Sequence, residues 1–176
     1  MGFDFRRLVL VLVPAGLLTA FVLFVTVGAP TLLANQPKPP PPEPIAFPHN
    51  VHVQAVRLEC TFCHRTAASG AVAGYPDLEQ CMFCHGVAGR GNPEADKVRM
   101  SWMAQQPINW ERVHRMPDHV HFVHSAHIQA GIQCATCHGD VGAMTQVVQV
   151  RPLTMSDCIA CHRQANAPTE CATCHN

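Results

Sequence analysis

Cysteine and histidine carry the chemistry available to this sequence. The chain of 176 residues has ten cysteines, and all of them fall into five Cys-x-x-Cys-His units. In such a unit two thiols form thioethers with the vinyl groups of a haem, and the adjacent histidine binds its iron. The predicted thioether-forming residues are Cys60, Cys63, Cys81, Cys84, Cys134, Cys137, Cys158, Cys161, Cys171 and Cys174. The predicted proximal iron ligands are His64, His85, His138, His162 and His175.

Two other uses of paired cysteines compete with haem attachment. These are disulfides in an exported protein and structural zinc on Cys-x-x-Cys knuckles. Neither explains why a histidine follows every second cysteine. One isolated unit would be a modest signal, whereas five without exception favour five covalently bound c-type haems. Their attachment requires that this part of the chain lies outside the cytoplasm.

The remaining histidines decide whether each iron is closed by a second ligand. A closed haem transfers electrons, whereas an open position permits chemistry on a substrate. Seven of the twelve histidines lie outside the five units, which is enough to close five irons. They are His49, His52, His114, His119, His121, His124 and His127.

Four of these histidines belong to an internal repeat. Phe47–His52 and Phe122–His127 share the pattern Phe-x-His-x-x-His, are offset by 75 residues, and are each followed by two Cys-x-x-Cys-His units. The repeat copies therefore span 47–85 and 122–162, with a fifth haem site at 171–175. Histidines three residues apart lie on one face of a helical turn, so one short helix can ligate two irons.

The elements that must position these ligands are short. Aromatic residues make up only 6% of the chain, so side chains alone cannot fill an ordinary core, and haem macrocycles would supply that apolar surface. We expect a mainly irregular fold with short α-helices around a core of five covalent haems. Asn92-Pro93-Glu94 predicts the start of a packing helix that carries Met100 and Met103. Lys plus Arg and Asp plus Glu are 12 each, so no basic surface favours nucleic acid.

The N-terminal part predicts a membrane anchor. Leu8–Val27 is uncharged and long enough to cross a hydrocarbon core as one transmembrane helix. Arg6 and Arg7 precede it and the next basic residue is Lys38, so the positive-inside rule places the N-terminus in the cytoplasm. The haem domain would then lie on the periplasmic side of the inner membrane. A cleaved signal peptide is the alternative, but the apolar stretch is longer than its usual apolar region.

Four segments follow from these patterns. The proline-rich stretch Gln36–Pro44 predicts a polyproline II spacer, because proline lacks a backbone donor and fixes φ. The predicted segments are a cytoplasmic N-terminus at 1–7, a transmembrane helix at 8–28, a linker at 29–46 and a pentahaem cytochrome c domain at 47–176.

The repeat resembles the class III multihaem cytochromes. In that class the first histidine of Phe-x-His-x-x-His ligates the haem of the next unit, and the second ligates a later haem. The stretch Cys161–Cys171 is also similar to the C-terminal pair of sites in that class. The resemblance implies a class III-like domain with distal pairs His49 with His64, His52 with His85, His124 with His138, and His127 with His162.

The haem on His175 has no partner in this scheme. The class places a histidine shortly before the penultimate unit, where this chain has Met155 and no histidine. The candidates are His114, Met144 and Met155, with His119 and His121 behind them in a strand-like run. A methionine ligand would raise the reduction potential relative to two histidines.

A closer resemblance is carried by two segments. Trp110–Asp118, with the pattern Trp-x-Arg-Val-His-x-x-Pro-Asp, and Pro152–Met155 resemble the pentahaem c-type subunit of alternative complex III, a bacterial quinol-oxidising complex. The resemblance implies electrons arriving from quinol through an iron-sulfur subunit and polytopic quinol-binding membrane subunits. The electrons would then pass from this subunit to a periplasmic monohaem cytochrome or to another acceptor such as a copper protein. His114 belongs to the shared segment, which favours it as the fifth distal ligand, while Met144 and Met155 stay open.

Three functions compete. The first is a non-catalytic electron-transfer subunit of a respiratory or photosynthetic complex, because no residue resembles a catalytic base beside an open site. The second is a self-contained membrane quinol dehydrogenase with a tetrahaem domain, against which the spacer and the fifth haem count. The third is a pentahaem nitrite reductase, which typically has a lysine as one proximal ligand, whereas all five units here end in histidine.

Overall fold

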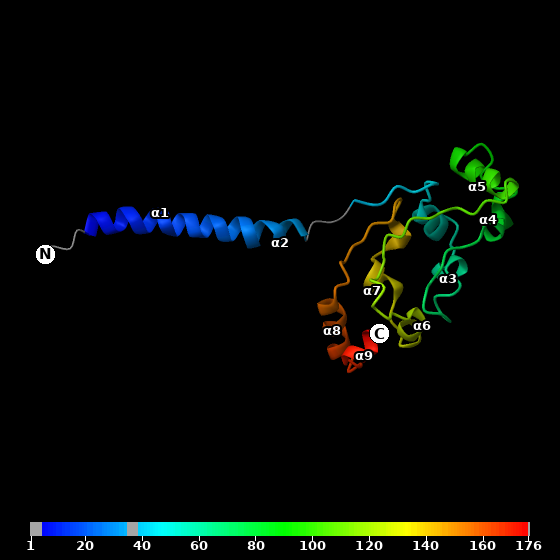
Figure 1. The fold of residues 1–176 in the computed structure, drawn as a ribbon. Helices are drawn as coiled ribbons and strands as arrows, with labels where there is room; N and C mark the ends of the chain where they lie inside the picture. Colours follow the sequence, from blue (N-terminus) through cyan, green and yellow to red (C-terminus); the bar gives the residue numbers. More distant parts are fainter. Residues whose placement is uncertain (1–4, 35–38, 176) are drawn as a thin grey trace. The chain divides into compact units, whose positions relative to one another are not determined.

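The computed structural model describes residues 5–34 and 39–175. The chain divides into two compact units, Met1–Pro37 and Lys38–Asn176. Within the described residues the regular structure is helical, and the one extended pairing is an isolated antiparallel bridge between Val120 and His175. The expectation of a mainly irregular fold with short helices and one N-terminal apolar helix is confirmed (Figure 1).

The first unit is one nearly continuous helical run. It consists of α1 (Phe5–Leu23), a π-helical turn (Phe24–Gly28) and α2 (Ala29–Ala34). The stretch Leu12–Leu32 has a mean hydropathy of 2.2 and none of it is buried, so its length and composition suit a membrane span. Two threonines inside this stretch, Thr19 and Thr26, each donate their hydroxyl to the carbonyl four residues earlier, which satisfies these polar groups without water.

This helix extends beyond residue 28, where the sequence predicted its end. Pro30 is the second residue of α2, and the π-helical turn stands directly before it. We interpret the wider turn as the local adjustment that accommodates the N–H missing at proline. Part of the predicted linker, residues 35–38, lies outside the described residues, and Pro39–Pro42 has no regular structure.

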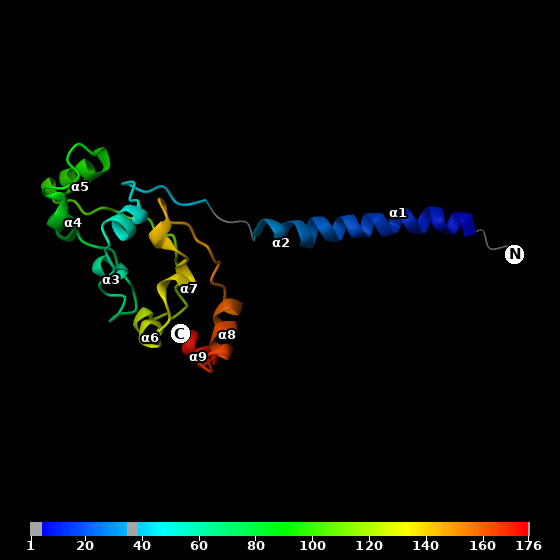
Figure 2. The same cartoon turned by 180° about the vertical axis from the view of Figure 1, so that it is seen from behind.

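The second unit contains short helices joined by irregular segments, as Figures 1 and 2 show from opposite sides. Every Cys-x-x-Cys-His unit coincides with a helix or its end, so the two thiols of each unit, three residues apart, lie on one side of a helical turn. The elements are η2 (Val51–Ala55), α3 (Cys60–Cys63), α4 (Leu78–His85), α5 (Pro93–Met103), α6 (His124–Gln129), α7 (Cys134–His138), η3 (Val141–Ala143), α8 (Met155–Gln164) and α9 (Cys171–Cys174).

The longer helices start at capping residues. The Asp77 carboxylate accepts the Gln80 N–H at the start of α4, and the Asn92 side chain accepts from Glu94 and Ala95 at the start of α5. Helix α8 starts at Thr154, which forms a reciprocal capping box with Asp157.

The predicted packing helix is therefore present as α5, but its methionines do not form its packed face. Met103 is 74% exposed and Met100 is 55% exposed, whereas Ala95 and Val98 are buried. Helix α5 packs against α4.

The polypeptide does not build a closed core of its own. Among the described residues the buried apolar side chains are Ile45, Ala67, Ala95 and Val98, and no large side chain is fully buried. Globular domains normally pack their interiors as densely as organic crystals. The thin core fits the expectation that haem groups fill the space between these helices.

Candidate haem sites

The two repeat segments hold their aromatic rings in the same arrangement. In the first, the Phe47 ring meets His49 edge-on at 4.8 Å between ring centres and stacks on His52 at 4.2 Å. In the second, Phe122 meets His124 edge-on at 4.8 Å and lies against His127 at 4.6 Å. The similarity extends from the sequence pattern to side-chain geometry, which favours duplication of one ligand-bearing unit.

The second histidine of each segment faces a predicted proximal ligand. The ring centres of His52 and His85 are 6.1 Å apart, and those of His127 and His162 are 6.0 Å apart. Two imidazoles that bind one metal ion from opposite sides, each at about 2 Å, have ring centres about 6 Å apart. Both pairs therefore have the separation that a haem iron between them requires.

The first histidine of each segment also lies near its predicted proximal partner, which is His64 for His49 and His138 for His124. His124 and His138 are nearly parallel, with ring centres 6.3 Å apart. Burial, followed by the nearby His64 and His52, lowers the pKa of His49 to about 4. Burial, followed by His114, also lowers the pKa of His138 to about 4. A low pKa keeps an imidazole neutral, which is the form that binds a metal.

The fifth pairing differs from the favoured expectation. The ring that stacks on His175 is that of His119, with centres 5.5 Å apart and planes 18° apart. The backbone explains the contact, because the His121 N–H donates to the Cys174 carbonyl and Val120 bridges to His175. The strand-like run around His119 and His121 is the feature of the sequence that this backbone pairing corresponds to, although the sequence favoured His114.

The other candidates for this position lie elsewhere. His114 meets His138 edge-on at 4.5 Å, which is shorter than the separation expected across an iron. Burial lowers the pKa of His114. The Met144 carbonyl accepts the Asn50 N–H beside the first repeat segment. Met155 begins α8 and is 66% exposed.

Backbone carbonyls orient most of these histidines. A carbonyl bound at Nδ1 fixes the ring and leaves Nε2 for a metal. Gly74, which holds His64, has φ +70°, and a Cβ there would lie 3.0 Å from the Thr66 hydroxyl. The Nδ1–carbonyl contacts are His52 with Pro48 (3.1 Å), His64 with Gly74 (2.7 Å), His124 with Ala71 (2.8 Å), His127 with Val123 (2.9 Å), His162 with Pro168 (2.5 Å) and His175 with His119 (3.2 Å).

The donor set fits haem better than the competing metals. No disulfide joins the ten cysteines, and the described residues contain no group of three or more His, Cys, Asp or Glu side chains that could hold a bare metal ion. Burial raises the pKa of the Cys63 and Cys81 thiols.

A cavity of about 760 Å³ lies beside His124 and is also lined by Arg112 and Arg115, whose charges suit the carboxylates of a haem.

Comparison with known proteins gives the same chemistry. Residues 120–176 match the family model of cytochrome c7 and related cytochromes c. The chain carries a cytochrome c7-like multihaem domain. It is also 28% identical over 160 residues to the multihaem cytochrome c subunit of menaquinone reductase from Nitratidesulfovibrio vulgaris, with 76% of each chain covered. These similarities imply covalently bound c-type haems and a role in electron transport.

Proposed function

We propose that this chain is a membrane-anchored pentahaem electron relay in which two histidines close every iron. Bound haem iron alternates between the ferric and ferrous states and so carries one electron. The observation that carries the proposal is the recurrence of histidine pairs at the separation an iron requires. The proposed proximal and distal ligands are His64 with His49, His85 with His52, His138 with His124, His162 with His127, and His175 with His119.

The protein's own residues hold these imidazoles rather than react. The carbonyls at Nδ1 fix ring orientation, and the neutral state of His49 and His138 leaves them ready to bind iron. Because each iron has a candidate for both axial positions, no position is left for a substrate. This favours a non-catalytic electron-transfer subunit over a nitrite reductase.

Contacts between the motifs support one row of haems. The first and second units meet where the Gln80 amide donates to the Phe62 carbonyl. The first and third units are linked through the loop after the first unit, whose Ala71 carbonyl lies 2.8 Å from Nδ1 of His124.

The remaining contacts extend the row. Arg151, which precedes α8, donates to the Thr136 carbonyl of the third unit at 3.0 Å. Burial, followed by Asp157 and the thiols Cys174 and Cys137, raises the pKa of the Cys158 thiol in the fourth unit. We infer the order second, first, third, fourth, fifth, which makes the His85 and His175 haems the two ends.

The setting of the relay is part of the proposal. We assign Leu12–Leu32 as an uncleaved span, with the haem domain on the periplasmic side of the inner membrane because Arg6 and Arg7 precede the span. We propose partners like those of alternative complex III: an iron-sulfur subunit, polytopic quinol-binding subunits, and a monohaem cytochrome or copper protein as acceptor. The similar subunit in N. vulgaris is named for a menaquinone reductase, so electron flow toward menaquinone is the second candidate direction.

Native extraction tests this function. Membranes solubilised in mild detergent are separated on a haem-stained native gel, and the haem band is assayed both with quinol plus an oxidised acceptor and with a reduced donor plus quinone. We expect the chain to migrate with iron-sulfur and polytopic membrane subunits and to oxidise quinol only in that assembly. An isolated chain that oxidises quinol by itself would contradict the relay and favour a self-contained quinol dehydrogenase.

A further inference from the structure

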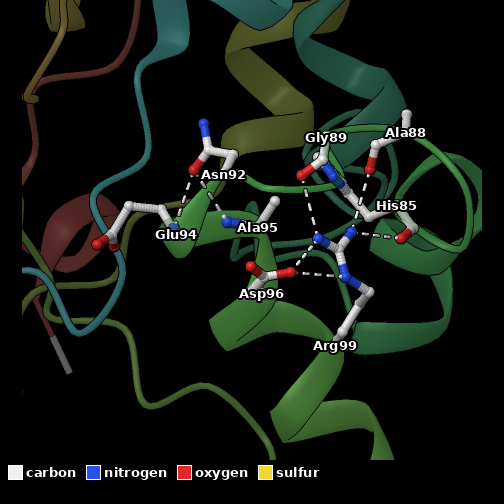
Figure 3. A network of polar contacts seen from close by, with 8 residues as sticks. All are labelled: His85, Ala88, Gly89, Asn92, Glu94, Ala95, Asp96 and Arg99. Atoms are coloured by element: carbon white, nitrogen blue, oxygen red, sulfur yellow. Dashed lines mark hydrogen bonds and ion pairs between the residues drawn. The ribbon is translucent and has the colours of Figure 1, made fainter.

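Helix α5 lies between the two repeat copies and takes no part in the ligand set, yet it is tied to one haem site. Figure 3 shows the Arg99 guanidinium surrounded by three backbone carbonyls. Nη1 donates to His85 at 2.9 Å and to Ala88 at 3.1 Å, and Nη2 donates to Gly89 at 3.0 Å. The Arg99 side chain is only 19% exposed, so this cation is held in place at the end of α4.

An acidic partner completes the contact. Arg99 also pairs with Asp96 one turn earlier on α5, with Nε 3.1 Å from the carboxylate (Figure 3). The turn that Arg99 holds packs directly on the His85 ring. A Cβ on Gly89, whose φ is +69°, would lie 3.3 Å from His85 Nδ1.

The start of α5 is tied to the distal side of the same site. The Glu94 carboxylate accepts the Ala46 N–H at 2.7 Å, directly before Phe47. Phe47 in turn stacks on His52, the proposed distal ligand opposite His85. Helix α5 thus fastens both halves of the His52–His85 site.

The equivalent site of the second copy is built differently. His85 Nδ1 is buried without a hydrogen-bond partner, whereas His162 Nδ1 lies 2.5 Å from the Pro168 carbonyl. An imidazole that donates to a carbonyl is a more basic ligand and stabilises ferric iron. A fixed cation has the opposite effect, because it favours the less positive ferrous state.

We propose that Arg99 is a positioning residue that sets the reduction potential of the His85 haem and holds it above that of the His162 haem. The reaction concerned is one-electron reduction of ferric to ferrous iron, with the electron supplied by a neighbouring haem of the relay. This inference rests on the proposed function, because it takes His52 and His85 as the two ligands of one iron.

The test is a potentiometric titration of the full-length, haem-loaded protein in detergent, followed by EPR and visible spectroscopy. In Arg99→Gln the Asp96 carboxylate loses its counter-ion, so we expect one haem of five to titrate at a lower potential with altered low-spin EPR signals. Arg99→Lys keeps the charge and is expected to retain most of the potential. Arg90→Gln, which removes an exposed charge from the same turn, is the matched control and is expected to leave all five potentials unchanged.

Two further variants identify the haem and guard against misfolding. The shifted signal must be the one that His52→Ala converts to high spin. If Arg99→Gln does not load five haems, Asp96→Asn replaces it, and the same haem must then titrate at a higher potential. Unchanged potentials in Arg99→Gln, or in Asp96→Asn, would overturn the role of Arg99. Absence of a low-spin His52–His85 haem in the unmodified protein would instead overturn the proposed function.

Discussion

The two repeat copies, residues 47–85 and 122–162, place their candidate ligands alike but support them differently. Phe47 and Phe122 contact their histidines in the same way. The ring centres of His52 and His85 are 6.1 Å apart, and those of His127 and His162 are 6.0 Å apart. The supports of the proximal histidines do not agree. His162 is held at Nδ1 by the Pro168 carbonyl, whereas His85 is held at its backbone by Arg99.

The difference separates two properties that a multihaem chain needs. Ligand placement is a local property of the repeat, because a helical turn carries both distal histidines. The electrostatic environment depends on what surrounds the repeat. Here α5 follows the first copy, and a loop to the fifth motif follows the second. In the proposed relay the two copies share their coordination and are expected to differ in reduction potential.

The largest expected effect comes from removing a distal ligand in either copy. His52→Ala or His127→Ala leaves one iron with a single protein ligand, so one haem of five should become high spin. EPR of the oxidised protein measures the conversion, and added imidazole should reverse it. If a variant keeps five low-spin haems, the histidine that it lacks is not a distal ligand, and the corresponding ligand pair is wrong.

The next effect distinguishes the candidates for the fifth iron. We expect His119→Ala to produce one high-spin haem, because His119 stacks on His175. His114→Ala is the matched comparison and should leave five low-spin haems, since His114 contacts His138 edge-on. The reverse result, seen by the same EPR measurement, would restore His114 as the ligand.

A smaller effect concerns the turn that supports His85. Gly89→Ala adds a Cβ 3.1 Å from Ala95 in a left-handed conformation, so we expect a loss of about 2 kcal/mol or more in unfolding free energy. Gly91→Ala shares the positive φ but meets open space, and it should cost about 1 kcal/mol. Denaturant unfolding of the haem-loaded protein measures both, and equal losses would show that the His85 turn is not closely packed.

The smallest effect compares the helix caps beside the two copies. Asn92→Ala at α5 and Thr154→Ala at α8 each remove a side chain that accepts helix N–H groups, which costs about 1 kcal/mol. We further expect that only Asn92→Ala shifts the reduction potential of the His85 haem in a potentiometric titration, because α5 is the helix tied to that site. A shift of the His162 haem alone would contradict the comparison.

The candidate haem ligands could be identified from local patterns. The five motifs and the two Phe-x-His-x-x-His segments are contiguous in sequence, so the candidate ligands could be listed from it, and the structure places His52 and His127 near the partners that the resemblance implied. The apolar N-terminal helix was equally evident, although the π-helical turn that carries it past Gly28 was not. The caps at Asn92 and Thr154 follow ordinary helix-start chemistry.

Contacts between distant segments were not predictable. His119 reaches His175 across 56 residues through a short backbone pairing, and the sequence favoured His114 because of its segment. Arg99 looked like an ordinary helix residue, since nothing in its spacing shows that three carbonyls converge on it. Pro168 acts through its carbonyl, which any residue carries.

Quantitative EPR of the oxidised, haem-loaded protein tests the central claim most directly. If five haems are each closed by two histidines, the integrated spectrum must account for five low-spin ferric haems per chain, with no high-spin signal. A high-spin haem, or fewer than five haems in total, would contradict the closed pentahaem relay.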